Sequence, residues 1–295
     1  MAAPRSLRVL CPAKINLGLW ILGRRADGYH DIDTVFQAVD LEDEVVIEEA
    51  PSGFSLQVEG IPILDQGPNL IERAWSLIEP RVSGRGVRVR LVKRIPIGAG
   101  LGGGSSDAAG FLVGVTRMFH LALAEEEMRA MCVRLGADLT FFLKGGTARG
   151  TGRGDEVRHL CPLPSAWIVL ATPPFAISTS WAYAKVRISL TPPEGGASML
   201  AVAIERGDWN EIAPLLHNDF EEVVVSEFAL LSQLKRSLVD GGSLGSLLSG
   251  SGSTVFGLAL TRNVAERAAE KAEEWGATVR VVRTTERGVA VQGPE

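Results

Sequence analysis

Residues 96–109 read Pro-Ile-Gly-Ala-Gly-Leu-Gly-Gly-Gly-Ser-Ser-Asp-Ala-Ala, a glycine loop that runs directly into an apolar segment. Five glycines in seven residues allow positive φ angles and a close approach to a ligand, because no Cβ stands in the way. Ser105, Ser106 and Asp107 are residue types that cap helices, so we expect a helix over 108–119. Loop N–H groups and the positive end of that helix would converge on one point. The segment therefore predicts a phosphate-binding loop.

Two better-known phosphate loops fit this segment less well. Residues 98–103 have the spacing G-x-G-x-x-G, but a dinucleotide site needs a buried parallel strand before it and an acidic residue about 20 positions later. Residues 86–93 instead alternate apolar and basic side chains, which indicates a half-exposed antiparallel strand. A Walker loop is excluded because no Gly-Lys-Ser or Gly-Lys-Thr follows. A flexible linker is disfavoured by the position between a strand and a capped helix.

The composition limits the class of protein. The 295 residues are 46% apolar, which is enough for two domains or one large domain. A net charge of −5 argues against a general affinity for nucleic acid. Three cysteines without metal spacing suit a reducing cytoplasm, and no apolar run reaches the roughly 18 residues of a membrane span. We therefore expect a soluble, unprocessed cytoplasmic protein without an obligate protein partner, and the oligomeric state stays open.

The order of predicted elements indicates an α+β fold. The first half is expected to contain strands over 7–11, 15–22, 32–40, 44–49 and 86–93 and helices over 70–78, 108–119 and 125–135. After a glycine-rich turn at 150–154, the second half is expected to contain strands over 166–171, 244–248, 254–260 and 278–283 and helices around 181–186, 199–205, 228–239 and 264–275. Irregular alternation argues against a doubly wound sheet, and the closing part has the order of a ferredoxin-like sandwich.

Three separated motifs carry a resemblance to a known family. Residues 12–17 read PAKINL, the glycine loop follows at 96–109, and residues 248–254 read LSGSGST. This triple resembles the GHMP kinase superfamily, whose members transfer the γ-phosphoryl group of ATP to small alcohols or phosphates. The resemblance implies two domains: residues 1–160 as an ATP-binding domain like domain 2 of ribosomal protein S5, and residues 161–295 as a ferredoxin-like domain on the substrate side.

Further motifs narrow the resemblance to one branch of the superfamily. These are GRRADGYH at 23–30, the extended loop GGGSSD at 102–107, GAD at 136–138 and NDFE at 218–221. They are similar to the branch that phosphorylates the 2-hydroxyl of a cytidine diphosphate-linked methylerythritol in the non-mevalonate isoprenoid route. The likeness extends over about 7–260. The alternatives are a homoserine-like or mevalonate-like kinase of the same superfamily, and a nucleotide-binding regulatory protein without turnover.

The resemblance implies a catalytic pair. Asp138 precedes an apolar run, so its carboxylate would be partly desolvated and suited to accept a hydroxyl proton, the role that the resemblance assigns to it. Lys14 is implied as its partner, which keeps the carboxylate ionised and acidifies the substrate hydroxyl. Asn16 shares the face of Lys14 on the strand and would hydrogen-bond the substrate. Without the resemblance, an acid at a helix end and a lysine on a strand are more often surface groups.

The same resemblance implies a cytosine site. Tyr29 would stack on the base and His30 would hydrogen-bond its polar edge, although such a pair in a turn is commonly only packing plus a surface histidine. The motif at 177–183, ISTSWAY, implies Thr179 as a substrate contact and Tyr183 as the aromatic residue that covers the opposite face of the base. Trp181 is the alternative to Tyr183.

ATP, with Mg²⁺, is the implied cofactor. The residues expected around its phosphates are Pro96, Ile97, Gly98, Ala99, Gly100, Leu101, Gly102, Gly103, Gly104, Ser105 and Ser106. Asn69 and Lys93 would lie near the adenosine. Ser106 is a candidate Mg²⁺ contact, and the other metal ligands stay unknown because no second acidic ligand stands out. Residues 249–253 form either a tight turn or a second set of N–H groups for the substrate's diphosphate.

Overall fold

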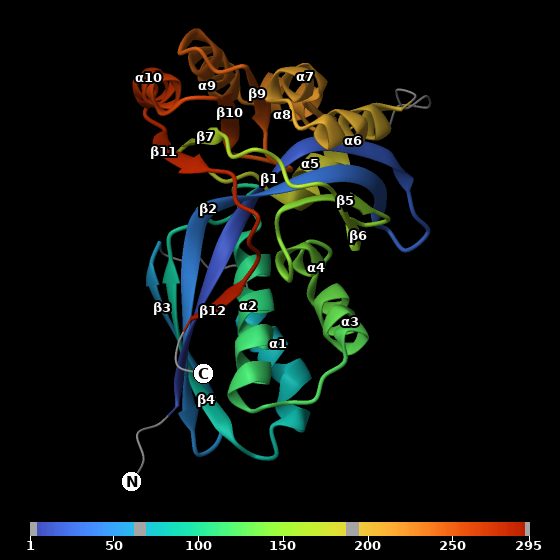
Figure 1. The fold of residues 1–295 in the computed structure, drawn as a ribbon, viewed down its shortest axis with the longest axis vertical. Coiled ribbons are helices and arrows are strands. Elements are labelled where there is room, and N and C mark those ends of the chain that lie inside the picture. Colours follow the sequence, from blue (N-terminus) through green and yellow to red (C-terminus); the bar gives the residue numbers. More distant parts are fainter. Residues whose placement is uncertain (1–4, 62–68, 187–194, 293–295) are drawn as a thin grey trace.

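The computed structural model describes residues 5–61, 69–186 and 195–292, which form the expected α+β fold with two sheets (Figure 1). The described strands of the large sheet are β1 Ser6–Arg24, β2 His30–Ala50, β3 Phe54–Gly60, β4 Gly86–Lys93, β5 Thr147–Thr151, β6 Glu156–His159, β8 His217–Asn218 and β12 Ala290–Gln292. Its main order is β12-β1-β2-β4-β3, with β5 paired to β2 and β6 and with β8 paired to β1. The small antiparallel sheet has the order β11 Thr278–Arg283, β7 Trp167–Thr172, β10 Val255–Ala259, β9 Gly245–Leu248.

Strands β1 and β2 are longer than the sequence predicted. The prediction of two strands in each region was wrong, because the antiparallel pairing continues through register shifts at Pro12/Ala13, Asn16/Gly18 and Ile21/Gly23. Such shifts bend a strand and let it accept an irregular residue without ending the ladder. Figure 1 shows β1 and β2 running most of the length of the molecule. The two strands therefore carry residues of the N-terminal motif into the region of the small sheet.

Four helices pack with the first half of the chain. They are α1 Leu70–Ile78, α2 Gly103–Met118, α3 Glu125–Leu135 and α4 Leu139–Phe142, with a 3₁₀ turn η1 Glu79–Arg81 after α1. Helix α1 starts where the sequence predicted, because Asn69 Oδ1 accepts the Ile71 N–H at 2.9 Å and Glu72 Oε2 accepts the Asn69 N–H at 2.8 Å. Phe111 of α2 and Ile47 of β2 belong to the buried core between helices and sheet.

The start of helix α2 differs from the prediction. The helix begins at Gly103, after Gly102 with φ +71°, and not at Ala108. Ser105, Ser106 and Asp107 lie in its first turns, and the N-terminus has no side-chain cap. The local preference of these residues for a cap is overridden because the Asp107 carboxylate is buried against Lys93 at 2.7 Å. The glycine loop thus ends five residues earlier than expected, at Gly102.

The second half of the chain covers the small sheet with helices. They are α5 Thr179–Lys185, α6 Gly196–Arg206, α7 Trp209–Ile212, α8 Glu221–Glu227, α9 Ala229–Asp240 and α10 Arg262–Glu273, with a 3₁₀ turn η2 Ala213–Leu215. The predicted strands of this half are all present within about two residues. Two segments return to the large sheet: β8 pairs parallel with β1, and β12, labelled in Figure 1, pairs antiparallel with β1. The boundary at 160/161 stays a prediction.

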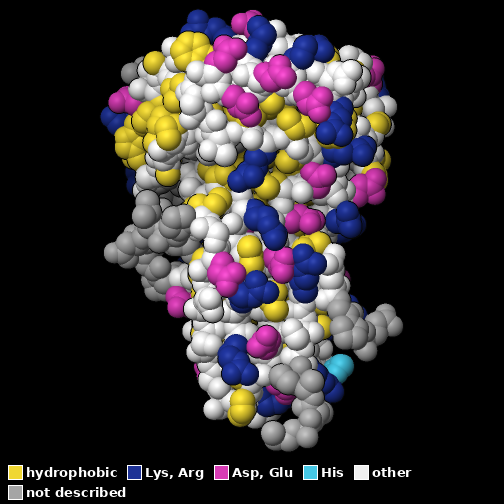
Figure 2. Space-filling view, turned by 90° about the vertical axis from the view of Figure 1, so that its left-hand side faces the viewer, with side chains coloured by type: hydrophobic (Ala, Val, Ile, Leu, Met, Phe, Trp, Pro, Cys, Tyr) yellow, Lys and Arg dark blue, Asp and Glu magenta, His cyan; other side chains and the backbone are white. Residues whose placement is uncertain are grey.

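The surface and the helices bear on two expectations from composition. Figure 2 shows lysine, arginine, aspartate and glutamate side chains interspersed over the described part of one face. That face presents no continuous basic surface of the kind that nucleic acids require. Among the described residues, no helix combines the length and the apolar character needed to cross a membrane.

Candidate active site

A single cleft of about 1170 Å³ brings the three motifs together. Of the residues predicted from sequence, those that line it are Lys14, Asn16, Tyr29, His30, Asn69, Lys93, Pro96, Ile97, Gly98, Ala99, Gly100, Leu101, Gly102, Gly103, Gly104, Ser105, Asp138, Thr179 and Tyr183. Ser106 does not line the cleft: it is fully buried, and its Oγ has no hydrogen-bond partner among the described residues. Gly250 and Ser251 of the third motif also line the cleft.

The glycine loop is joined to the third motif by hydrogen bonds. Ser249 Oγ donates to the Gly100 carbonyl at 2.9 Å, and the Thr254 N–H donates to the Ala99 carbonyl at 3.2 Å. Gly100 has φ +77°, and a Cβ at this position would collide with the Ser249 carbonyl. The loop is also tied to β1, because the Lys14 N–H donates to the Leu101 carbonyl at 3.0 Å. Two loops far apart in the sequence therefore form one glycine-rich wall.

Lys14 and Asp138 face each other in this cleft. Lys14 Nζ lies 3.5 Å from Asp138 Oδ2 and donates to Asn16 Oδ1 at 2.6 Å. Lys14 is only 4% exposed, and the side chain of Asp138, which directly precedes α4, is 31% exposed. Burial lowers the pKa of Lys14, whereas the Asp138 carboxylate opposes this shift. The lysine is thus held inside the protein, while the carboxylate reaches the cleft.

Asn16 orients Lys14 through a short chain of hydrogen bonds. Its Nδ2 donates to Thr34 Oγ1 at 2.8 Å, and that hydroxyl donates to the Gly18 carbonyl at 2.6 Å. The Asn16 amide is therefore already occupied on both sides, and its contact with a substrate stays a prediction. Thr34 was missed by the sequence analysis, because it comes from β2 and no local motif marks it.

Lys93 is the centre of a buried ion triad below the glycine loop. Its Nζ lies 2.5 Å from Asp43 Oδ2 and 2.7 Å from Asp107 Oδ2. Asp43 Oδ1 also accepts the N–H groups of Arg94 and Ile95, where the loop leaves β4. Burial alone would lower the pKa of Lys93, but Asp107 and Asp43 outweigh it and the net shift is upward. Burial raises the pKa of Asp107 to about 8, with Asp43 adding to the shift and Lys93 opposing it.

This triad changes the expectation for Lys93. The Lys93 ammonium is held by Asp43 and Asp107. Lys93 therefore fixes the junction between β4, the loop and α2, independently of any contact with a nucleotide. Proximity of Lys93 and Asn69 to the adenosine stays a prediction, because both residues line the cleft but no nucleotide is present. No local motif marks Asp43 as a partner of Lys93, because Asp43 lies 50 residues earlier in the chain.

A group of aromatic side chains also lines the cleft. The His30 and Tyr183 rings are stacked, with centroids 4.7 Å apart and an interplanar angle of 19°. Tyr183 also packs edge-on against Phe220 at 4.8 Å. Tyr29 is 58% exposed, and the Arg153 guanidinium carbon lies 5.0 Å from its ring centroid. The His30 ring thus occupies the space in front of the Tyr183 ring. A base could be sandwiched between Tyr29 and Tyr183 only after these side chains move.

The surroundings of His30 and Tyr183 favour the neutral forms of both side chains. Burial, with a smaller effect of Arg24, lowers the pKa of His30, so its imidazole is neutral at pH 7. Burial, followed by the charge of Asp138, raises the pKa of Tyr183 to about 12. Thr179 Oγ1 lies 3.0 Å from Ser251 Oγ, which links α5 to the third motif. Trp181, the alternative to Tyr183, does not line the cleft and packs edge-on against Phe228.

The described residues contain no ready-made metal cage. No group of three or more His, Cys, Asp or Glu side chains is arranged to bind a metal in the described ranges. The carboxylates that line the cleft as described are Asp107 and Asp138. A site of this kind is compatible with Mg²⁺, which usually binds one or two carboxylates together with substrate phosphates.

The arrangement has close counterparts among known proteins. The chain matches the GHMP kinases N terminal domain over residues 69–146 and the GHMP kinases C terminal domain over residues 200–278. Its fold is that of a homoserine kinase from Cytophaga hutchinsonii, with a TM-score of 0.77 over 99% of both chains at 17% identity. Fold and cleft together define a GHMP kinase, a class of small-molecule kinases.

More similar relatives identify the family within this class. The chain is 38% identical over 280 residues to a 4-diphosphocytidyl-2-C-methyl-D-erythritol kinase of Pelotomaculum thermopropionicum, covering 94% of this chain and 98% of the relative. It is 40% identical over 288 residues to the enzyme of the same name from Citrifermentans bemidjiense, covering 94% and 100%. A crystal structure of 4-(cytidine 5'-diphospho)-2C-methyl-D-erythritol kinase superposes with a TM-score of 0.80 at 36% identity, covering 94% and 98%. The chain therefore belongs to the 4-diphosphocytidyl-2-C-methyl-D-erythritol kinase family.

Proposed function

We propose that this protein transfers the γ-phosphoryl group of ATP to the 2-hydroxyl of 4-diphosphocytidyl-2-C-methyl-D-erythritol, a step in the non-mevalonate formation of isoprenoid precursors. The observation that carries the proposal is the placement of Lys14 Nζ 3.5 Å from Asp138 Oδ2 in the cleft lined by the glycine loop. The shared name of relatives that match nearly the whole chain supports the choice of substrate. A cytoplasmic location fits the three free cysteines.

The catalytic pair is suited to in-line transfer from ATP. Asp138 accepts the proton of the attacking hydroxyl as the new O–P bond forms, and the bond between the γ-phosphorus and the β–γ bridging oxygen breaks to release ADP. The ammonium of Lys14 stabilises the negative charge that develops on the hydroxyl oxygen, because it is fixed by Asn16 on one side and Asp138 on the other. Positioning and charge compensation are the main requirements of such a reaction.

The glycine loop and helix α2 are suited to hold the phosphates of ATP. Gly98, Gly100 and Gly102 all have positive φ, which curls the loop next to the helix N-terminus. The helix dipole and the backbone N–H groups favour negative charge at this point. Lys93 does not neutralise the phosphates by itself, since Asp43 and Asp107 compensate its charge.

Mg²⁺ is the metal that commonly accompanies ATP. Bound there, it would neutralise the charge of the ATP phosphates. Asp107 fits as a protein ligand, because it lines the cleft and its buried Oδ1 has no hydrogen-bond partner among the described residues. This geometry favours Asp107 over Ser106, whose hydroxyl is buried away from the cleft.

Recognition of the substrate is assigned to the aromatic side chains of the cleft. Tyr29 is proposed to stack on cytosine, and His30, neutral at pH 7, to hydrogen-bond its polar edge. Tyr183 packs behind His30. Thr179, which lies beside Ser251, is proposed to contact the methylerythritol part of the substrate. Asn16, which accepts a hydrogen bond from Lys14, is proposed to contact the substrate as well.

The test is a coupled assay of ADP release on the full-length protein. ADP is expected with 4-diphosphocytidyl-2-C-methyl-D-erythritol and not with homoserine, mevalonate or no acceptor, and ³¹P NMR is expected to show a new phosphomonoester. Turnover of homoserine or mevalonate in place of the cytidyl substrate would assign the protein to another activity of the superfamily. ATP binding without turnover of any acceptor would favour a regulatory protein.

A further inference from the structure

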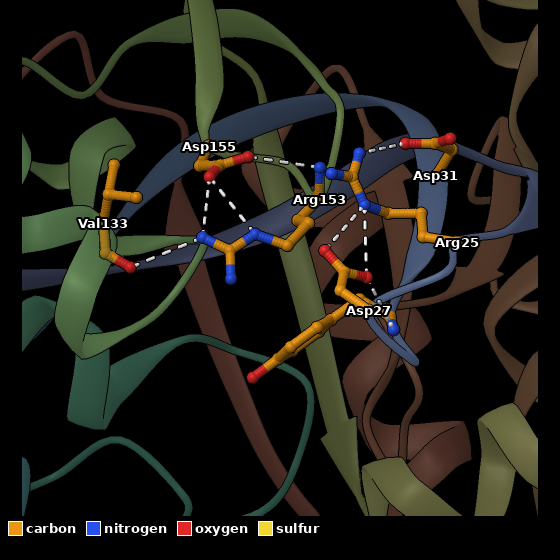
Figure 3. A network of polar contacts seen from close by, with 7 residues as sticks. Arg25, Asp27, Asp31, Val133, Arg153 and Asp155 are labelled. Carbon is orange, nitrogen blue, oxygen red and sulfur yellow. Dashed lines mark hydrogen bonds and ion pairs between the residues drawn. The ribbon is translucent and has the colours of Figure 1, made fainter.

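A polar network holds the loop that presents Tyr29 (Figure 3). Arg25 Nε lies 3.1 Å from Asp27 Oδ2, and Arg25 Nη1 lies 2.7 Å from Asp31 Oδ1. The Tyr29 N–H donates to Asp27 Oδ1 at 3.1 Å. These contacts fix the backbone between β1 and β2, but none of them fixes the phenol ring, which stays 58% exposed. The ring needs a further contact if it is to be held ready for a base.

Arg153 supplies that contact from a different part of the chain. It lies in the turn between β5 and β6, and its guanidinium carbon is 5.0 Å from the Tyr29 ring centroid. Asp155 Oδ2 holds the guanidinium through Nη2 at 2.9 Å and Nε at 3.3 Å (Figure 3). Nη2 also lies 3.5 Å from the Val133 carbonyl. The orientation of the guanidinium is therefore set by the protein before any ligand arrives.

The contact with Arg153 determines which face of the Tyr29 ring is available to a ligand. A guanidinium stacks on one face of an aromatic ring, and the opposite face stays available for a second planar group. Both residues line the cleft together with His30. An exposed tyrosine without such a partner would lose more rotamer freedom on binding a base, which weakens the complex. Arg153 thus reduces the entropic cost of recognising a base at this site.

We infer that Arg153 is a positioning residue for cytosine recognition, which holds Tyr29 so that the base stacks on the ring face away from the guanidinium. The inference rests on the proposed function, since it assumes a cytidyl substrate. The glycine-rich turn at 150–154 is then part of the base site, and Arg153 acts through Tyr29 and not on the diphosphate of the substrate.

The test is a double-mutant cycle with binding measured by calorimetry on the full chain. Arg153→Met is expected to weaken CDP and CMP equally, by about 3- to 10-fold, the range of a partly desolvated cation–π contact. In the Tyr29→Ala background the same substitution is expected to have no further effect. The kcat at saturating substrate and the affinity for ATP are expected to stay within about twofold. Arg158→Met, an exposed arginine outside the cleft on β6, is the matched control.

Several outcomes would overturn the inference. If Arg153→Met lowered CDP affinity by the same factor in the Tyr29→Ala background, Arg153 would act independently of Tyr29, and a loss for CDP but not for CMP would place its contact at the second phosphate. Arg153→Lys covers the case in which the methionine variant does not fold: it keeps the charge but lacks the planar group, so the affinity loss is expected to persist. Full affinity in Arg153→Lys would contradict stacking. If the wild-type protein bound neither CDP nor CMP, the proposed function itself would fail.

Discussion

The catalytic residues and the base-binding residues of the cleft are held in different ways. Lys14 and Asn16 are 4% and 1% exposed and lie on β1 inside the large sheet. Tyr29 is 58% exposed and lies on a turn. Phosphoryl transfer depends on fixed positions of the reacting groups, which a sheet interior provides. Recognition of a base tolerates adjustment, which turns and stacked rings provide. The comparison predicts that substitutions among the buried residues affect turnover or stability, whereas those among the base-binding residues affect substrate affinity.

Asp138→Asn is the most severe test of the catalytic residues. The amide cannot accept the hydroxyl proton, so kcat is expected to fall by about 10²- to 10⁴-fold while the affinity for ATP stays within a few-fold. Steady-state kinetics and ATP calorimetry measure the two effects separately. A variant with nearly wild-type kcat would remove Asp138 from the role of general base.

Lys93→Met tests the buried triad. The variant leaves Asp43 and Asp107 buried without a cation, so the free energy of unfolding is expected to fall by about 3–5 kcal/mol. Arg90→Met on the same strand is the control, because its ion pair with Glu59 is exposed and contributes at most about 1 kcal/mol. Urea unfolding measures both. Equal effects of the two substitutions would show that the triad does not stabilise the loop junction.

Gly100→Ala tests the contact between the two glycine motifs. The new methyl group would meet the Ser249 carbonyl at a residue with φ +77°, so a loss of about 1–3 kcal/mol in the free energy of unfolding is expected, together with weaker ATP binding. Gly104→Ala is the control, since its Cβ would lie 3.7 Å from Leu70 Cδ1, an ordinary contact. If Gly100→Ala were as stable as Gly104→Ala, the close approach of the two loops would be incorrect.

His30→Ala tests the base-binding residues. Loss of its hydrogen bonds is expected to weaken CDP by about 1–3 kcal/mol without changing ATP affinity, and to reduce the preference for cytidine over uridine. Because burial lowers the pKa of His30, the loss of wild-type CDP affinity that accompanies protonation of the ring is expected at lower pH than for a free imidazole. Calorimetry at several pH values measures this. A decline that persists in His30→Ala would belong to another group.

Much of the fold was predictable because local signals were strong. The helix Leu70–Ile78 has a capping box, the strand Gly86–Lys93 alternates in side-chain character, and the helix Glu125–Leu135 ends at a glycine. The errors occur where tertiary contacts outweigh local preference. Asp107 is a good cap residue by type, yet the structure places it inside α2, where its side chain is buried and hydrogen-bonded to Lys93. Separate strands were predicted over 7–11 and 15–22, but a register shift at Pro12/Ala13 lets β1 continue.

The features of the candidate site also fall into two groups, those predicted from local motifs and those that depend on tertiary contacts. The motifs by themselves predicted the phosphate loop and the family resemblance, because both depend on residue types at fixed short spacings, and the resemblance implied the roles of Lys14 and Asp138. Only the tertiary structure showed the Asn16–Thr34 chain, the Asp43–Lys93–Asp107 triad and the contact of Arg153 with Tyr29. Those partners lie 14 to 124 residues apart, from Lys93 and Asp107 to Tyr29 and Arg153. Contacts of that range are set by strand register and packing, which no local pattern encodes.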